Sequence, residues 1–141
     1  MNVNVIGPQG GIVQPDLHAN IVLAVRNFAQ QLGISRLKNK ILVRVHHKVF
    51  MNDDGTQALC ESIDQRNFVI DICMYSNWVV NLAHEMVHVK QFARRETCGY
   101  GVKWKGKKIA PKTPYYDLPW EKEAYKMQDR LAQLVWDADV L

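Results

Sequence analysis

One stretch near the middle of the chain, NLAHEMVHVKQF (residues 81–92), restricts the fold more than any other. When its residues are placed at about 100° intervals, apolar side chains recur at spacings of three and four. This periodicity predicts a helix that runs to about residue 96 with one face in the core. Ser76 is a suitable N-cap for it. The predicted core stripe consists of Val79, Leu82, Met86, Val89 and Ala93.

The opposite face of this helix is polar and carries His84 and His88 one turn apart. Their Cβ atoms would lie about 6 Å apart, so two neutral imidazoles can bind one metal ion. Glu85 can reach the edge of that site without binding the metal. This is the HExxH pattern, in which the histidines bind Zn²⁺ and the glutamate is a general base. A solvated polar helix face is the alternative. The full polar face comprises Asn77, Asn81, His84, His88, Gln91 and Arg95.

The ligand set needs a third member, because catalytic zinc usually has three protein ligands and one open position. No histidine follows His88, so the remaining ligand is a downstream carboxylate or an upstream histidine. Glu121 and Glu123, at the start of the last predicted helix, are the best-placed acids. They border the apolar stripe of that helix on opposite sides, so periodicity does not choose between them.

The segments LAHEMVHVKQ and PWEKEAYK together resemble the gluzincin branch of zinc metallopeptidases. The chain is also similar to small single-domain metallopeptidases of phage and bacterial genomes, in the style of SprT-like domains. The resemblance covers about residues 66–128. In gluzincins a glutamate of a later helix, in an ExxA(D) setting, completes the site. Glu121 and Ala124 match this setting, which implies Glu121 as the third ligand, whereas Tyr125 replaces the usual acid.

The resemblance implies hydrolysis of a peptide or protein substrate by a zinc-activated water, with Glu85 as the general base. It also implies that the substrate lies antiparallel to an edge strand, for which residues 66–75 are the candidate. Gln91 either holds a water beside the metal or faces solvent. The candidates for a donor to the oxyanion are Tyr115, Tyr116, Tyr125, Arg94 and Arg95.

Three other functions stay open. The metal could instead stabilise the fold of a non-catalytic binding domain, and such a structural site would not need Glu85. The chain could be a DNA-associated protease that binds phosphates through the basic region 90–112. HExxH is also compatible with hydrolysis of an amide bond outside peptides.

The remaining pattern predicts one α+β domain over residues 15–141 after an irregular segment at 1–14. Helices are expected at 15–33 and 117–138, strands at 40–50 and 66–75, and a hairpin or loop at 100–110. The sequential strands predict a short antiparallel or mixed sheet packed against the helices.

Composition sets the broad class. The chain has 48% apolar and 23% charged residues and a net charge of +4. It has no secretory signal and no run near the roughly 18 apolar residues of a membrane span, so a cytoplasmic protein is expected. The basic stretches are interpreted as solvated surface, with nucleic-acid binding as the alternative. The three cysteines are widely spaced and are predicted to be at least half-buried.

Overall fold

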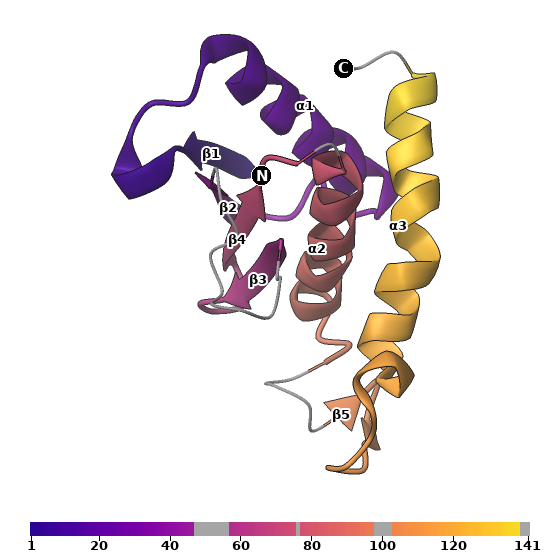
Figure 1. The fold of residues 1–141 in the computed structure, drawn as a ribbon. Helices are drawn as coiled ribbons and strands as arrows, with labels where there is room; N and C mark the ends of the chain where they lie inside the picture. Colours follow the sequence, from indigo (N-terminus) through magenta and orange to yellow (C-terminus); the bar gives the residue numbers. More distant parts are fainter. Residues whose placement is uncertain (47–56, 76, 98–102, 139–141) are drawn as a thin grey trace.

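A mixed four-stranded sheet, in the order β1-β2-β4-β3, forms one side of the molecule (Figure 1). The computed structural model describes residues 1–46, 57–75, 77–97 and 103–138. Three strands are parallel, and β3 runs antiparallel to β4 at one edge. The predicted α+β architecture with a mixed sheet is therefore confirmed. The strands are β1 (Asn2–Ile6), β2 (Lys40–His46), β3 (Ala58–Ser62) and β4 (Asn67–Cys73).

The helices form two further layers. α1 packs against β1, α2 packs against β3 and β4, and α3 packs on α2 and α1. In Figure 1, α2 consequently lies between the sheet and α3. None of the helices in the described ranges is long and apolar enough to cross a membrane. The helices are α1 (Pro15–Gln31), α2 (Trp78–Ala93) and α3 (Pro119–Asp137).

The core forms where one face of the sheet meets the helices. β2 and β4 are in register, with Val43 opposite Ile70 and Val45 opposite Ile72. Because side chains alternate between the faces of a strand, these residues point the same way, and all four are buried. The alternation predicted for the second strand is therefore correct.

Two strands depart from the sequence-based expectation. Residues 1–14 were expected to be irregular, yet β1 pairs with β2 from Asn2 to Ile6. β3 was not predicted at all. β1 contains the strand-favouring residues Val3, Val5 and Ile6, but it is short and is followed by a Gly- and Pro-rich stretch. β3 contains Ala, Glu and Ser, which have weak strand preference, and its pairing with β4 overrides that preference. Their formation depends on tertiary context.

The helix boundaries follow the prediction closely. Gly33 lies just beyond α1 with φ of 73°, a conformation that glycine adopts without strain. α2 starts at Trp78 and ends at Ala93, three residues short of the expected end. The proposed N-cap, Ser76, and residues 47–50 of the predicted strand lie outside the described residues.

Smaller elements connect α2 to α3. A two-stranded hairpin, β5 (Lys103–Trp104) and β6 (Lys107–Lys108), is followed by the 3-10 helix η2 (Tyr115–Asp117). Another 3-10 helix, η1 (Pro8–Gly10), precedes α1. The expected hairpin is thus present. Cys60 is half-buried and Cys73 is buried, as predicted, while Cys98 lies outside the described residues.

Candidate metal centre

The middle of the polar face of α2 is covered, while Asn77 and Arg95 at its two ends are exposed. Val79, Leu82, Met86 and Val89 of the predicted stripe are buried, as expected. On the opposite side, however, His84 is 9% exposed and Gln91 is 0% exposed. The reason is that α3 packs on this side of the helix. The alternative of a solvated polar face therefore does not hold around His84 and Gln91, since these polar groups lie between two helices.

His84 and His88 meet Glu121 from α3 at this interface. Glu121 Oε1 lies 3.0 Å from His84 Nε2 and 3.2 Å from His88 Nε2. Ligand atoms held tetrahedrally at about 2.0–2.1 Å from Zn²⁺ would be about 3.3 Å apart. The contacts with the two nitrogens thus have nearly the spacing that one tetrahedral ion requires.

Glu123, the competing acid, points to different partners. Its Oε1 accepts hydrogen bonds from Lys90 Nζ at 2.8 Å and Gln91 Nε2 at 3.1 Å. The structure therefore brings Glu121, and not Glu123, to the histidines. Two residues separate these acids in sequence, and the rotation of α3 against α2 decides which one faces the imidazoles.

The outer nitrogen of each histidine contacts a glutamine. Nδ1 of His84 lies 2.8 Å from Gln128 Oε1, and Nδ1 of His88 lies 2.8 Å from Gln91 Oε1. Gln91 Nε2 donates to the Trp120 carbonyl at 2.9 Å and to Glu123. Because both of those groups are acceptors, the oxygen of Gln91 must face His88. His88 Nδ1 is then the donor, and a neutral ring carries its lone pair on Nε2, toward Glu121.

This arrangement fits a bound cation. In both rings, each nitrogen faces an oxygen acceptor, yet a neutral imidazole can donate from only one nitrogen. Double protonation of both rings would satisfy these contacts, and so would a cation placed where the Nε2 lone pairs and Glu121 converge. Two imidazoles and one carboxylate are a common donor set for catalytic Zn²⁺. The residues present therefore fit this metal.

The pKa shifts show the same preference for positive charge. Burial acts to lower the pKa of His88, but Glu121 and Glu85 outweigh it and raise that pKa to about 9. Burial acts to raise the pKa of Glu121, yet its hydrogen bonds with the two histidines lower it to about 2. The common cause is the direct contact between the Glu121 carboxylate and the imidazoles, which favours the charged form of each partner.

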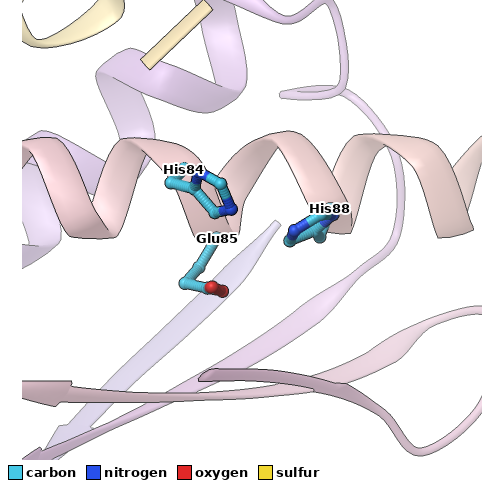
Figure 2. A group of neighbouring side chains, drawn as sticks. All are labelled: His84, Glu85 and His88. Carbon is cyan, nitrogen blue, oxygen red and sulfur yellow. The ribbon is translucent and has the colours of Figure 1, made fainter. Parts of the chain in front are cut away.

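Glu85 lies beside the centre without bonding to it. Its carboxylate has an oxygen within 4.8 Å of ligand nitrogens of both histidines. Figure 2 shows these three side chains leaving neighbouring positions of α2 toward a shared space. Within the described part of the chain, Glu85 Oε2 is buried without a hydrogen-bond partner. Burial, the main cause, raises the pKa of Glu85. Since Glu121 contacts both Nε2 atoms directly, Glu121 is the better third ligand and Glu85 is free for another role.

A cavity of about 540 Å³ opens next to His84 and Glu85. Tyr115, Tyr116 and Tyr125 line it, and the Tyr125 ring centroid is 4.6 Å from that of His84. Burial and a hydrogen bond with Tyr125 raise the pKa of Tyr115, which keeps its hydroxyl protonated. These three candidates for an oxyanion donor are thus brought to the site.

The other candidates lie elsewhere. Arg94 donates to the Gly33 carbonyl at 2.7 Å, and Arg95 donates to Gln65 at 2.8 Å. Of the upstream histidines, His46 contacts Asp71 at 2.8 Å. Asp71 and Val69 lie on the sheet face opposite Ile70, away from α2, so His46 does not reach the centre.

Two glutamines complete the site. Gln91, expected to hold a water or face solvent, instead contacts His88 directly. Its spacing of three from His88 was the signal for this contact. Gln128 was missed, although it follows Glu121 by seven residues and so lies two helical turns along the same face of α3.

A scan against protein-family models found no match. Searches of curated proteins and of solved structures found none either.

Proposed function

We propose that this protein is a zinc-dependent metallopeptidase, with His84, His88 and Glu121 as the zinc ligands. The observation that carries the proposal is the contact of one Glu121 oxygen with Nε2 of both histidines, at 3.0 and 3.2 Å. This contact joins two helices whose histidines and glutamate are far apart in sequence. It supplies the third ligand that HExxH alone lacks.

The bound Zn²⁺ would supply a Lewis acid and would lower the pKa of a bound water to about 7. Glu85 is the general base in this proposal. Its buried and unpartnered Oε2 is suited to accept a proton from that water and to pass it to the leaving amine. Burial raises the pKa of Glu85, and this favours the first transfer, because a more basic carboxylate accepts a proton more readily.

The tyrosines are suited to stabilise charge on the substrate oxygen. The Tyr125 ring lies against His84, and Tyr115 remains a protonated donor. Either hydroxyl can donate a hydrogen bond to the oxyanion that forms during amide hydrolysis.

The strand expected to bind the substrate needs correction. β4 was the candidate, but it is paired with β2 on one side and with β3 on the other. Among the described strands, β3 is the sheet edge beside α2, and Ala58 lines the cavity. We therefore assign the extended peptide to β3, where it can pair through its backbone.

A catalytic role is favoured over a purely structural metal by two features. The cavity reaches His84 and Glu85, so one side of the centre is open to a substrate. A structural site would have that position closed by a fourth protein ligand. It would also have no use for a buried carboxylate such as Glu85.

Binding of an acidic partner is a second candidate function, supported by the hairpin between α2 and α3. Five exposed lysines gather there, which makes a basic surface suited to phosphates. If this surface binds nucleic acid, DNA binding should weaken steeply as salt is raised. The lysines are Lys103, Lys105, Lys107, Lys108 and Lys112.

The primary test is zinc content combined with activity. The purified chain should contain about one zinc, Glu121→Ala should lose most of it, and Glu123→Ala should retain it. Glu85→Gln should keep the metal while peptide hydrolysis falls by about 10²- to 10⁴-fold. A folded, zinc-free wild type after metal is supplied, or full activity in Glu85→Gln, would refute the proposal.

A further inference from the structure

The cavity beside the metal centre has an unusual lining. Its walls carry four carboxamides and three phenols, and among the described residues they hold no lysine, arginine or aspartate. Glu85 is the single carboxylate in that lining. With a divalent cation bound, the charges of Glu85 and Glu121 would be balanced. A charged substrate side chain would therefore find no partner here.

Two carboxamides of this lining, Gln57 and Asn81, are hydrogen-bonded to each other. Asn81 Nδ2 donates to Gln57 Oε1 at 3.3 Å. Gln57 is fixed from the other side, because its backbone carbonyl accepts from the Cys73 N–H at 2.9 Å. Within the described residues, Asn81 Oδ1 and Gln57 Nε2 have no hydrogen-bond partner. One acceptor and one donor therefore remain, which is the complement of a third carboxamide.

Burying an apolar or a charged substrate side chain in this cavity would cost free energy. An apolar side chain would cover the two polar groups without satisfying them, and an ion would lose water without gaining a counter-charge. A carboxamide or hydroxyl satisfies both groups and remains neutral. The tyrosine rings add apolar faces on which the flat amide can rest.

We infer that this cavity selects peptides whose residue beside the cleaved bond carries an uncharged hydrogen-bonding side chain, above all Asn or Gln. The inference rests on the proposed peptidase function and deepens it. Gln57 and Asn81 are the residues that determine the selection.

The test is a peptide mixture with randomised residues, incubated with the zinc-loaded chain and read by mass spectrometry. At one position next to the cleaved bond, Asn and Gln should exceed Asp, Glu, Lys and Arg by at least about tenfold. Equal cleavage of charged and uncharged sequences, or a preference for apolar residues, would overturn the inference.

A charge placed in the cavity sharpens this test. Asn81→Asp should shift the preference at that same position toward Lys and Arg. The variant should fold, because Asn81 lies in the first turns of α2, where an acid interacts favourably with the helix dipole. Asn20→Asp, the same change on α1 and outside the cavity, is the matched control and should leave the profile unaltered. An unaltered profile in Asn81→Asp would contradict the assignment.

Binding measurements separate this inference from the peptidase proposal. Zinc-loaded Glu85→Gln should bind a Gln-containing peptide about tenfold more tightly than its Glu or Lys counterpart. If this selectivity holds while the wild type cleaves nothing, the selection stands and the peptidase proposal fails. If the wild type cleaves peptides but neither protein discriminates between the Gln, Glu and Lys peptides, the peptidase proposal stands and the selection fails. If the variant binds none of the peptides, the selection is refuted.

Discussion

Gln91 is a single buried carboxamide that joins three parts of the centre. Its oxygen accepts from His88, and its nitrogen donates to Glu123 and to the carbonyl of Trp120. Both of the acceptors for its nitrogen come from α3. The orientation of the His88 ring is thereby coupled to the packing of the two helices. Residues that hold a metal-binding histidine in this way commonly affect metal affinity about as much as a weak ligand does.

Replacing this carboxamide tests that coupling. Gln91→Leu should weaken zinc binding by about 10- to 100-fold, because the His88 ring loses the acceptor that fixes its tautomer. Zinc affinity is measured by competition with a chelating dye. Gln133→Leu makes the same change on the exposed surface of α3 and should bind zinc like the wild type. Equal affinities for the two variants would mean that Gln91 does not position the ring.

At the scale of elements, the α2–α3 interface is held by charge as well as by apolar packing. Lys90 of α2 contacts Glu123 of α3 at 2.8 Å and Glu96, beyond the end of α2, at 2.7 Å. These groups are mostly shielded from solvent, and Gln91 connects them to His88. The Lys90–Glu123 pair therefore adjoins the candidate metal centre and contributes to the same packing of the two helices.

The pH dependence of this pair has a definite sign. Burial acts to raise the pKa of Glu123, but hydrogen bonds from Lys90 and Gln91 outweigh it and lower the pKa below the usual 4.5. A carboxylate with a lowered pKa in the folded state stabilises the protein above the unfolded-state value. That stabilisation is lost as the pH falls through the folded-state value.

We therefore expect the Glu123→Gln substitution to cost most at neutral pH. The difference in free energy of unfolding between this variant and the wild type should shrink as the pH falls below about 4.5. Urea unfolding of the metal-free proteins at a series of pH values measures it. If the difference in free energy of unfolding between the two proteins stays constant across the acidic range, the ionised Glu123 carboxylate is not the source of that difference.

At the scale of the whole molecule, the candidate metal centre lies between layers rather than inside one element. His84 and His88 belong to the middle layer, and Glu121 belongs to the outer helix (Figure 1). A metal bound there by the folded state alone shifts the unfolding equilibrium. It should stabilise the packing of α3 on α2 in particular.

Removal of zinc should consequently lower the melting temperature. At a free zinc concentration about 1,000 times Kd, binding contributes about 4 kcal/mol. In a domain of this size that corresponds to roughly 10 °C. Thermal unfolding with zinc and with excess chelator measures the shift, and Glu121→Ala should show little of it. An equal shift in Glu121→Ala would indicate that the ion binds elsewhere.

The sequence by itself determined what depends on helical period. It predicted α2, the core stripe of that helix, and the placement of His84 and His88 one turn apart on the other side. It also reduced the candidates for a third ligand to a few downstream acids and the upstream histidines, because HExxH needs one more donor. These features are local, since residues three and four apart on a helix are always neighbours.

Only the tertiary structure decided which distant groups meet. The docking of α3 on α2 brings Glu121 to the histidines, directs Glu123 to Lys90, and buries the part of the polar face that carries His84 and Gln91. Sheet pairing makes β3 the edge strand and places β4 inside. Each outcome depends on the rotation or register between segments far apart in the chain, and a shift of one residue in either would change which side chains face the site.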